Sequence, residues 1–214
     1  MSIEHNPDYI HHQDPGFSAL FREFVFGAED GMVSTLGAIT GIATATQNPF
    51  TTVLSGFVII SVESVSMAVG SYLSSKSEQS IDLAKMEEER VEIAKFPDGE
   101  KKELAAMLVS DGWSSGMAQK MSDEAATKPD LMLKEMAYRE LKISPDNLEQ
   151  PFKNAIVMGI SYIFGGSIPL LPYLIFNVST AVIISIITTL IALFGLGVFT
   201  VKFSKRPWWK SGLE

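Results

Sequence analysis

Several glutamates are spaced so that they share helix faces. Glu89 and Glu92 lie three residues apart, and Glu100 and Glu103 repeat that spacing a little further along the chain. Residues three or four apart are neighbours on a helix surface, so each pair occupies one face. Carboxylates that converge on one volume repel one another unless a cation neutralises them, which is typical of a divalent-metal site. Spacing alone also allows a solvated acidic helix face, because runs of charge usually face water.

A methionine and a fifth glutamate extend this pattern. Met136 and Glu140 lie four residues apart and share a face of a later predicted helix. Carboxylates alone suit hard cations, whereas an added thioether favours a softer first-row metal such as Fe(II) or Mn(II) over Mg(II) or Ca(II). The predicted metal ligands are therefore Glu89, Glu92, Glu100, Glu103, Met136 and Glu140.

A second group of acids lies in strongly apolar surroundings. Asp30 lies about six residues into the first apolar segment, and Glu63 lies near the middle of the second. An acid at the centre of a membrane helix costs at least ~2.5 kcal/mol, so such a residue is a functional-site hypothesis by default. The alternative is an interfacial or protonated side chain that is hydrogen-bonded to a neighbouring helix. Met67 follows Glu63 by one turn and could add a soft ligand, although a methionine on an apolar helix more often packs.

The charges are segregated along the chain, and this decides the fold class. Of 42 charged residues, 29 fall between Lys76 and Lys153, whereas residues 24–75 hold three and residues 154–201 hold none. A membrane span needs roughly 20 mainly apolar residues, so each apolar block is long enough for two helices. We therefore predict an all-α, polytopic membrane helical bundle with a helical metal-binding insert. The absence of cysteine excludes a disulfide scaffold, and the net charge of -8 argues against nucleic acid as a partner.

The predicted organisation has five parts. Residues 1–23 form an N-terminal segment, 24–75 the first two membrane helices, 76–151 the Glu-rich insert, 152–203 two further membrane helices, and 204–214 a basic and aromatic tail. Turn formers at residues 47–49 and at Asn177 separate the paired spans, giving helices over 24–46, 51–75, 152–176 and 179–203. The second span is expected to continue as one long helix to Phe96. Shorter helices are expected over 100–110, 115–126 and 130–142.

Glycine and proline carry further expectations for the membrane helices. Gly27 with Gly31, and Gly37 with Gly41, have the small-xxx-small spacing that allows close helix packing. The third span is expected to be loosened by Gly165, Gly166, Pro169 and Pro172. Such broken helices are tolerated in membranes where they line a cavity.

The basic residues predict an orientation. One of these residues precedes the first span, 12 fall from Lys76 to Lys153, four follow Val201, and none falls in the two connecting turns. Because cytoplasmic flanks carry the excess of basic residues, both termini and the insert are predicted to be cytoplasmic. The tail resembles an interfacial anchor, so a fifth helix is expected beyond it. No Glu-x-x-His pair of a di-iron enzyme occurs, because all three histidines precede Gln13, and we predict that the chain is not an enzyme.

Three motifs resemble the vacuolar iron transporter family: residues 24–35 (FVFGAEDGMVST), 66–72 (SMAVGSY) and 165–172 (GGSIPLLP). The resemblance covers nearly the whole chain, in the family's order around a Glu-rich insert. It implies five spans, a homodimer with a transport path between the protomers, and exchange of cytosolic Fe(II), often also Mn(II), for protons. It also implies transport roles for Asp30 and Met67, and metal binding by the five insert glutamates with Met136. The second-span glutamate of the family falls at Ile59, whereas this chain carries Glu63 one turn later.

The predicted function is export of Fe(II) from the cytoplasm in exchange for protons, with Mn(II), Zn(II) and Co(II) as further candidate metals. Asp30, Glu63 and Met67 would line the transport path. The membrane would be the plasma membrane of a prokaryote or the vacuolar membrane of a eukaryote. The alternative is a membrane-tethered metal-binding module that buffers or senses iron without moving it.

Overall fold

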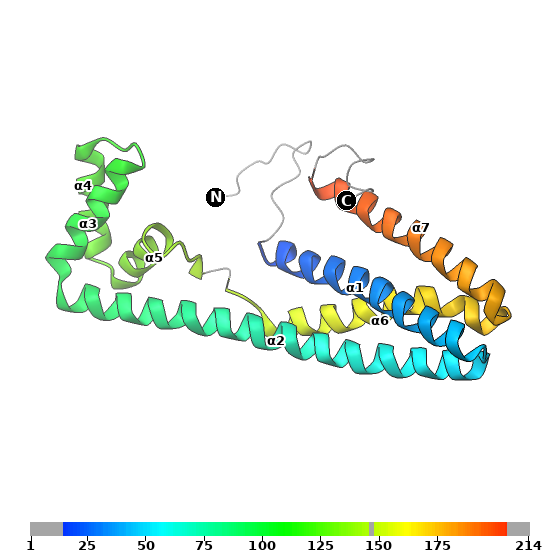
Figure 1. Cartoon of the computed structure of the whole chain (residues 1–214). Coiled ribbons are helices and arrows are strands. Elements are labelled where there is room, and N and C mark those ends of the chain that lie inside the picture. Colours follow the sequence, from blue (N-terminus) through cyan, green and yellow to red (C-terminus); the bar gives the residue numbers. More distant parts are fainter. Residues whose placement is uncertain (1–14, 146–147, 205–214) are drawn as a thin grey trace, which may run out of the picture. The chain divides into compact units, whose positions relative to one another are not determined.

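The computed structural model describes residues 15–145 and 148–204, and nearly all of them are helical. Within these ranges the helices are α1 (Pro15–Thr46), α2 (Pro49–Lys95), α3 (Pro97–Ser110), α4 (Ser115–Ala126), α5 (Pro129–Arg139), α6 (Pro151–Ile175) and α7 (Val178–Ser204) (Figure 1). The predicted all-α class is therefore confirmed. The chain divides into unit 1, Met1–Ser74 with Pro151–Glu214, and unit 2, Ser75–Gln150.

The turns between the membrane helices follow from local side-chain chemistry. Gln47 has a φ of 49°, and the Asn48 side chain accepts a hydrogen bond of 3.0 Å from the backbone N–H of Thr51. Asn177 caps α7 in the same way, by accepting from the backbone N–H of Thr180 at 3.0 Å. Both contacts satisfy backbone donors that have no partner within the helix, so each new helix begins at the predicted turn.

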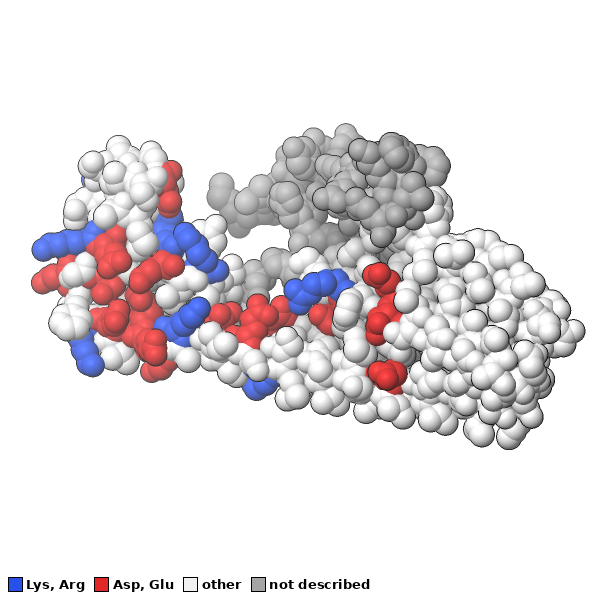
Figure 2. All heavy atoms as spheres, in the orientation of Figure 1, with Lys and Arg blue, Asp and Glu red and all other residues white. Residues whose placement is uncertain are grey.

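Three of the described helices, α2, α6 and α7, are long and apolar enough to cross a membrane. Helix α1 is not among them, so the four-span count stays a prediction. Many large apolar side chains on unit 1 are exposed, including Phe57, Phe164 and Ile191. Exposed apolar surface of this extent is expected on the outer face of a membrane bundle, because lipid tails contact that face in place of water. Figure 2 shows the same contrast, with few charged side chains on this part of the surface and many on unit 2.

Close contact between α1 and α6 holds unit 1 together. A Cβ atom on Gly27 would lie 2.7 Å from the carbonyl oxygen of Met158, and one on Gly31 would collide with the carbonyl of Tyr162. From the other side, a Cβ on Gly165 would collide with the carbonyl of Ala28. The predicted packing role of the first glycine pair is thus confirmed, whereas Gly37 and Gly41 have no atom within 4 Å of such a Cβ.

Unit 2 packs α3, α4 and α5 around a small apolar core. The core comprises Leu104, Leu108, Ala118, Ala125, Met132 and Met136. Gly112 ends α3 with a φ of 100°, and the Ser114 side chain accepts from the backbone N–H of Met117 to start α4. These are the ordinary uses of glycine after a helix and of serine before one.

Several predicted boundaries are corrected by the structure. Helix α1 begins at Pro15 instead of Phe24, because proline is favoured in the first helical turn, and Pro97 likewise begins α3 where the sequence predicted only a break. Helix α5 ends at Arg139 and not at Lys142, which has a φ of 58°. Helix α6 is continuous through Pro169 and Pro172, so the third span is not broken, and the glycines before them serve packing.

Predictions for the three histidines, for residues 1–14 and for the tail after residue 204 lie outside the described residues.

Candidate metal site and membrane carboxylates

Three glutamates from three helical elements of unit 2 meet at one point. Glu89 lies on the second half of α2, Glu100 in the first turn of α3, and Glu140 directly after α5. Each offers a carboxylate oxygen, and these three oxygens all lie within 4.8 Å of one another. Oxygens bound to one first-row ion at about 2.1 Å lie roughly 3–4 Å apart, so only a slight contraction would place an ion between them.

The site is buried on the side of α2 and α3. The exposed fractions of Glu89 and Glu100 are only 3% and 8%, whereas Glu140 is exposed. Oε1 of Glu89 is fully buried and has no hydrogen-bond partner. Carboxylates are almost never buried without a partner, and a buried oxygen in this state requires an explanation such as an ion or water.

Burial and mutual repulsion perturb the acidity of all three groups. The pKa of Glu89 rises from 4.5 to about 7, first because the carboxyl is buried and then because of the charges of Glu140, Glu100 and Glu92. The pKa values of Glu100 and Glu140 are also raised, again mainly by desolvation and then by neighbouring glutamates. The interaction between the Glu89 and Glu140 side chains raises the pKa of Glu89 further and opposes the rise in the pKa of Glu140.

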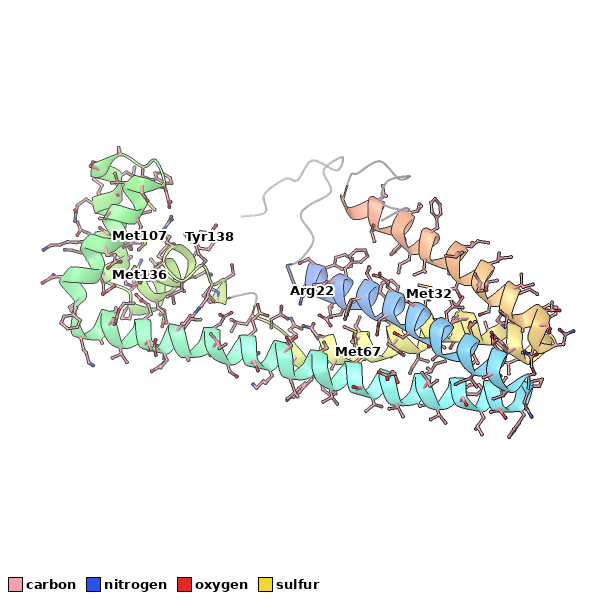
Figure 3. All side chains as sticks on the ribbon, viewed as in Figure 1. Arg22, Met32, Met67, Met107, Met136 and Tyr138 are labelled. Atoms are coloured by element: carbon pink, nitrogen blue, oxygen red, sulfur yellow. The ribbon has the colours of Figure 1, made fainter. Side chains whose placement is uncertain are left out.

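The remaining predicted ligands take different positions. Glu92 and Glu103 are exposed, yet the charge of Glu92 acts on all three central glutamates and that of Glu103 acts on Glu100 and Glu140. The predicted pairs therefore lie at one cluster, with one member of each pair at its centre. Met136 is fully buried in the apolar core, one turn before Glu140, and Met107 packs against the same core (Figure 3). Contact of the Met136 sulfur with an ion stays a prediction.

In unit 1, the buried hydroxyl of Tyr162 is the feature that connects the membrane acids. Asp30 is half-buried on α1 and accepts a hydrogen bond of 3.0 Å from the Ser34 hydroxyl. Tyr162 is fully buried, and its hydroxyl makes no hydrogen bond of normal geometry. Asp30 and Glu63 act on this hydroxyl electrostatically, and Ser34 and Thr35 are its polar neighbours. This tyrosine was not predicted as a site residue, although a tyrosine within an apolar helix is a signal, because its hydroxyl needs a partner.

The two predicted path residues on α2 are less enclosed. Glu63 is exposed and Met67 is half-buried; Figure 3 labels Met67 on this helix. A carboxylate exposed in the middle of an apolar helix is costly against lipid, so this face calls for a polar or protein neighbour.

Glu23 is a second acid that sequence reasoning missed, because it was assigned to the polar N-terminal segment. Its exposed fraction is 7%, and it accepts a hydrogen bond of 2.7 Å from the Ser71 hydroxyl on α2. Arg22 pairs with its other oxygen at 3.3 Å. The sequence carried no signal for this contact, because Glu23 and Ser71 are 48 positions apart.

These observations define an all-α integral membrane protein whose polar helical unit carries a buried carboxylate cluster. The model of the VIT family matches residues 21–214, and the chain therefore belongs to the VIT family. It is 28% identical over 207 residues to vacuolar iron transporter 1 of Arabidopsis thaliana, covering 95% of this chain and 83% of that protein. It is 26% identical over 195 residues to the vacuolar iron transporter of Plasmodium berghei, covering 86% of this chain and 71% of that protein.

Proposed function

We propose that this protein transports Fe(II) across a membrane in exchange for protons and that unit 2 captures the metal. The observation that carries the proposal is the meeting of Glu89, Glu100 and Glu140 from three helical elements. Its relatives are named vacuolar iron transporters, which supports metal-ion transport as the function of this chain.

The chemistry of unit 2 suits reversible capture of a divalent cation. Glu92 and Glu103 add negative charge at the rim and would raise the local concentration of cations. Bound metal would neutralise the repulsion among the three central carboxylates and give the buried Glu89 oxygen a partner to coordinate. If the Met136 sulfur also binds, the site favours Fe(II), Mn(II), Zn(II) or Co(II) over the harder Mg(II) and Ca(II).

Proton exchange follows from carboxylate chemistry. A carboxylate must be deprotonated to bind a cation, so metal and protons compete for the same oxygens. With a pKa of about 7, Glu89 is partly protonated near neutral pH and would release its proton on binding metal. In the membrane unit, Asp30 and Glu63, which both act electrostatically on Tyr162, offer carboxylates for the same competition.

The exposed position of Glu63 supports a homodimer with the transport path between protomers. A second copy packed on this face of α2 would cover Glu63 and remove the cost of exposing a carboxylate to lipid. Met67 lies one turn further along the same helix and would add a thioether to that path. In this proposal unit 2 lies on the cytoplasmic side, which its many basic residues support.

One observation favours the rival function of a tethered metal-binding module. Ile59 stands where the family resemblance places a glutamate, and Glu63 lies one turn away from that position. A module that only binds iron would need the carboxylates of unit 2 and not Glu63.

Two measurements on the full chain distinguish these functions. Binding of Fe(II) is expected to fall when Glu89 and Glu100 are both replaced by Gln, and to stay unchanged in Glu63→Gln. Uptake of Fe(II) into proteoliposomes, by contrast, is expected to be lost in Glu63→Gln. Undiminished uptake in Glu63→Gln would argue against this path. Absent uptake by the unmodified chain, with binding intact, would favour the module.

A further inference from the structure

Arg139 is a cation next to a predicted metal ligand in the sequence, yet it does not neutralise the metal site. It is the last residue of α5 and directly precedes Glu140. The charged groups that act on Glu89, Glu100 and Glu140 are glutamates alone among the described residues. The positive charge of Arg139 must therefore be held elsewhere.

Two carboxylates on different helices hold the guanidinium group. Its Nε donates to Oε2 of Glu135 at 3.1 Å, within α5, and its NH1 donates to Oδ2 of Asp111. Asp111 caps the end of α3, the helix whose first turn carries Glu100, a predicted ligand. The Arg139 side chain is only 16% exposed, so these charge-assisted bonds are partly shielded from water.

The position of Glu140 explains why this matters for the metal site. Glu140 follows the last helical residue of α5, and its backbone N–H bonds to the carbonyl of Met136. Beyond it the chain leaves the helix, and Lys142 has a φ of 58°. A helix end frays unless something fixes it, so the Glu140 carboxylate depends on the last turn of α5 being held.

We propose that Arg139 is a positioning residue of the metal site, which rests on the function proposed above. Its ion pairs join the end of α5 to the end of α3, and thereby hold the Glu140 carboxylate beside Glu100. The same pairs keep the positive charge of Arg139 away from the carboxylates, where it would compete with the metal. A planar guanidinium can join two carboxylates in this way, and a lysine ammonium does so poorly.

Arg90 provides a matched control. It directly follows a predicted ligand, Glu89, just as Arg139 precedes one, but its side chain is 64% exposed and pairs only loosely with Glu87 at 3.6 Å. Removing either arginine subtracts one positive charge near the cluster. If only electrostatics mattered, removal of either arginine would strengthen metal binding. If Arg139 positions Glu140, removal of Arg139 weakens binding and removal of Arg90 does not.

The test is titration of the full chain in detergent with Mn(II), with unbound Mn(II) followed by its electron paramagnetic resonance signal. We expect Arg139→Gln and Arg139→Lys to bind Mn(II) at least about tenfold more weakly than the unmodified chain, as is usual when a residue that orients a metal ligand is lost. Asp111→Asn is expected to weaken binding as well, because it removes the ion pair that joins the end of α5 to the end of α3. Arg90→Gln is expected to bind equally well or more tightly.

Affinity at or above that of the unmodified chain in Arg139→Gln overturns the inference while leaving the proposed function intact. If circular dichroism shows that Arg139→Gln is unfolded, Arg139→Lys and Asp111→Asn decide in its place, and unchanged affinity in both overturns the inference. A purely structural role would lower the unfolding temperature without changing affinity well below it. Failure of the unmodified chain to bind Mn(II) would instead remove the metal site itself, and the inference with it.

Discussion

Raising the pH is predicted to destabilise unit 2 in the absence of metal, because Glu89 must lose its proton inside an acidic cluster. The pKa of Glu89 is about 7 in the folded chain, against an ordinary value of 4.5. The folded state therefore holds this proton more tightly than the unfolded state does. Consequently, the free energy of unfolding falls as the pH rises from about 4.5 through about 7, and levels off above that window.

The size of the effect follows from that difference in pKa. One pH unit corresponds to about 1.4 kcal/mol, so the loss attributable to Glu89 is at most about 3.5 kcal/mol. Replacement of Glu89 by Gln introduces an amide that is neutral at every pH, so the contribution of Glu89 to the pH dependence of stability is removed. A divalent metal should restore the stability lost at high pH, because it binds only the deprotonated, folded site.

Tryptophan fluorescence can report unit 2 separately. The chain has three tryptophans, and replacing Trp208 and Trp209 by Phe leaves Trp113, which lies between α3 and α4. Unfolding of this full-length variant would be followed from about pH 5 to about pH 8. Glu124→Gln is the control, because Glu124 lies in an exposed pair with Lys128 and should leave the pH dependence unchanged. Equal stability across that pH range, or an unchanged slope in Glu89→Gln, would refute the reasoning.

Three further predictions concern packing and ligand chemistry. Gly165→Ala should prevent folding of the membrane unit, seen as loss of the monodisperse peak in size-exclusion chromatography, whereas Gly37→Ala, with open space around the new methyl group, should behave as the unmodified chain does. Met136→Leu should change the free energy of unfolding by less than about 1.5 kcal/mol, because the side-chain volume is kept. If the Met136 sulfur binds metal, this substitution should lower the affinity for Co(II) relative to that for Mg(II). An unchanged ratio of the two affinities would exclude a thioether ligand. Tyr162→Phe removes a buried hydroxyl that makes no hydrogen bond of normal geometry, so folding should be unaffected; slower Fe(II) uptake in proteoliposomes would assign the hydroxyl to transport, and unchanged uptake would exclude it.

The helix pattern was largely predictable because its signals are local. Gln47, Asn48 and Asn177 ended or began helices as their side-chain chemistry requires, and the charge segregation separated the membrane helices from unit 2. Proline was harder to interpret: Pro15 and Pro97 begin helices, whereas Pro169 stands within one. The same residue type favours a first turn and disfavours an interior, so the outcome depends on packing that a sequence does not display.

The acidic cluster was predictable only in part. Spacing identified two glutamate pairs, but it could not tell which member of each pair lies at the centre. The packing of α3 and α5 decides that Glu89 and Glu100 are buried while Glu92 and Glu103 remain exposed. The role of Arg139 was hidden for the same reason, because its partner Asp111 is distant in sequence.

The most direct test of proton-coupled metal transport is to follow both ions in the same vesicles. The full chain would be reconstituted into liposomes that contain an iron-sensitive dye and a pH-sensitive dye, and Fe(II) would be added outside. The proposed exchange predicts that protons leave the vesicles as Fe(II) enters, and that an opposing proton gradient accelerates the uptake. Fe(II) entry at the same rate without proton movement and without response to the gradient would contradict it.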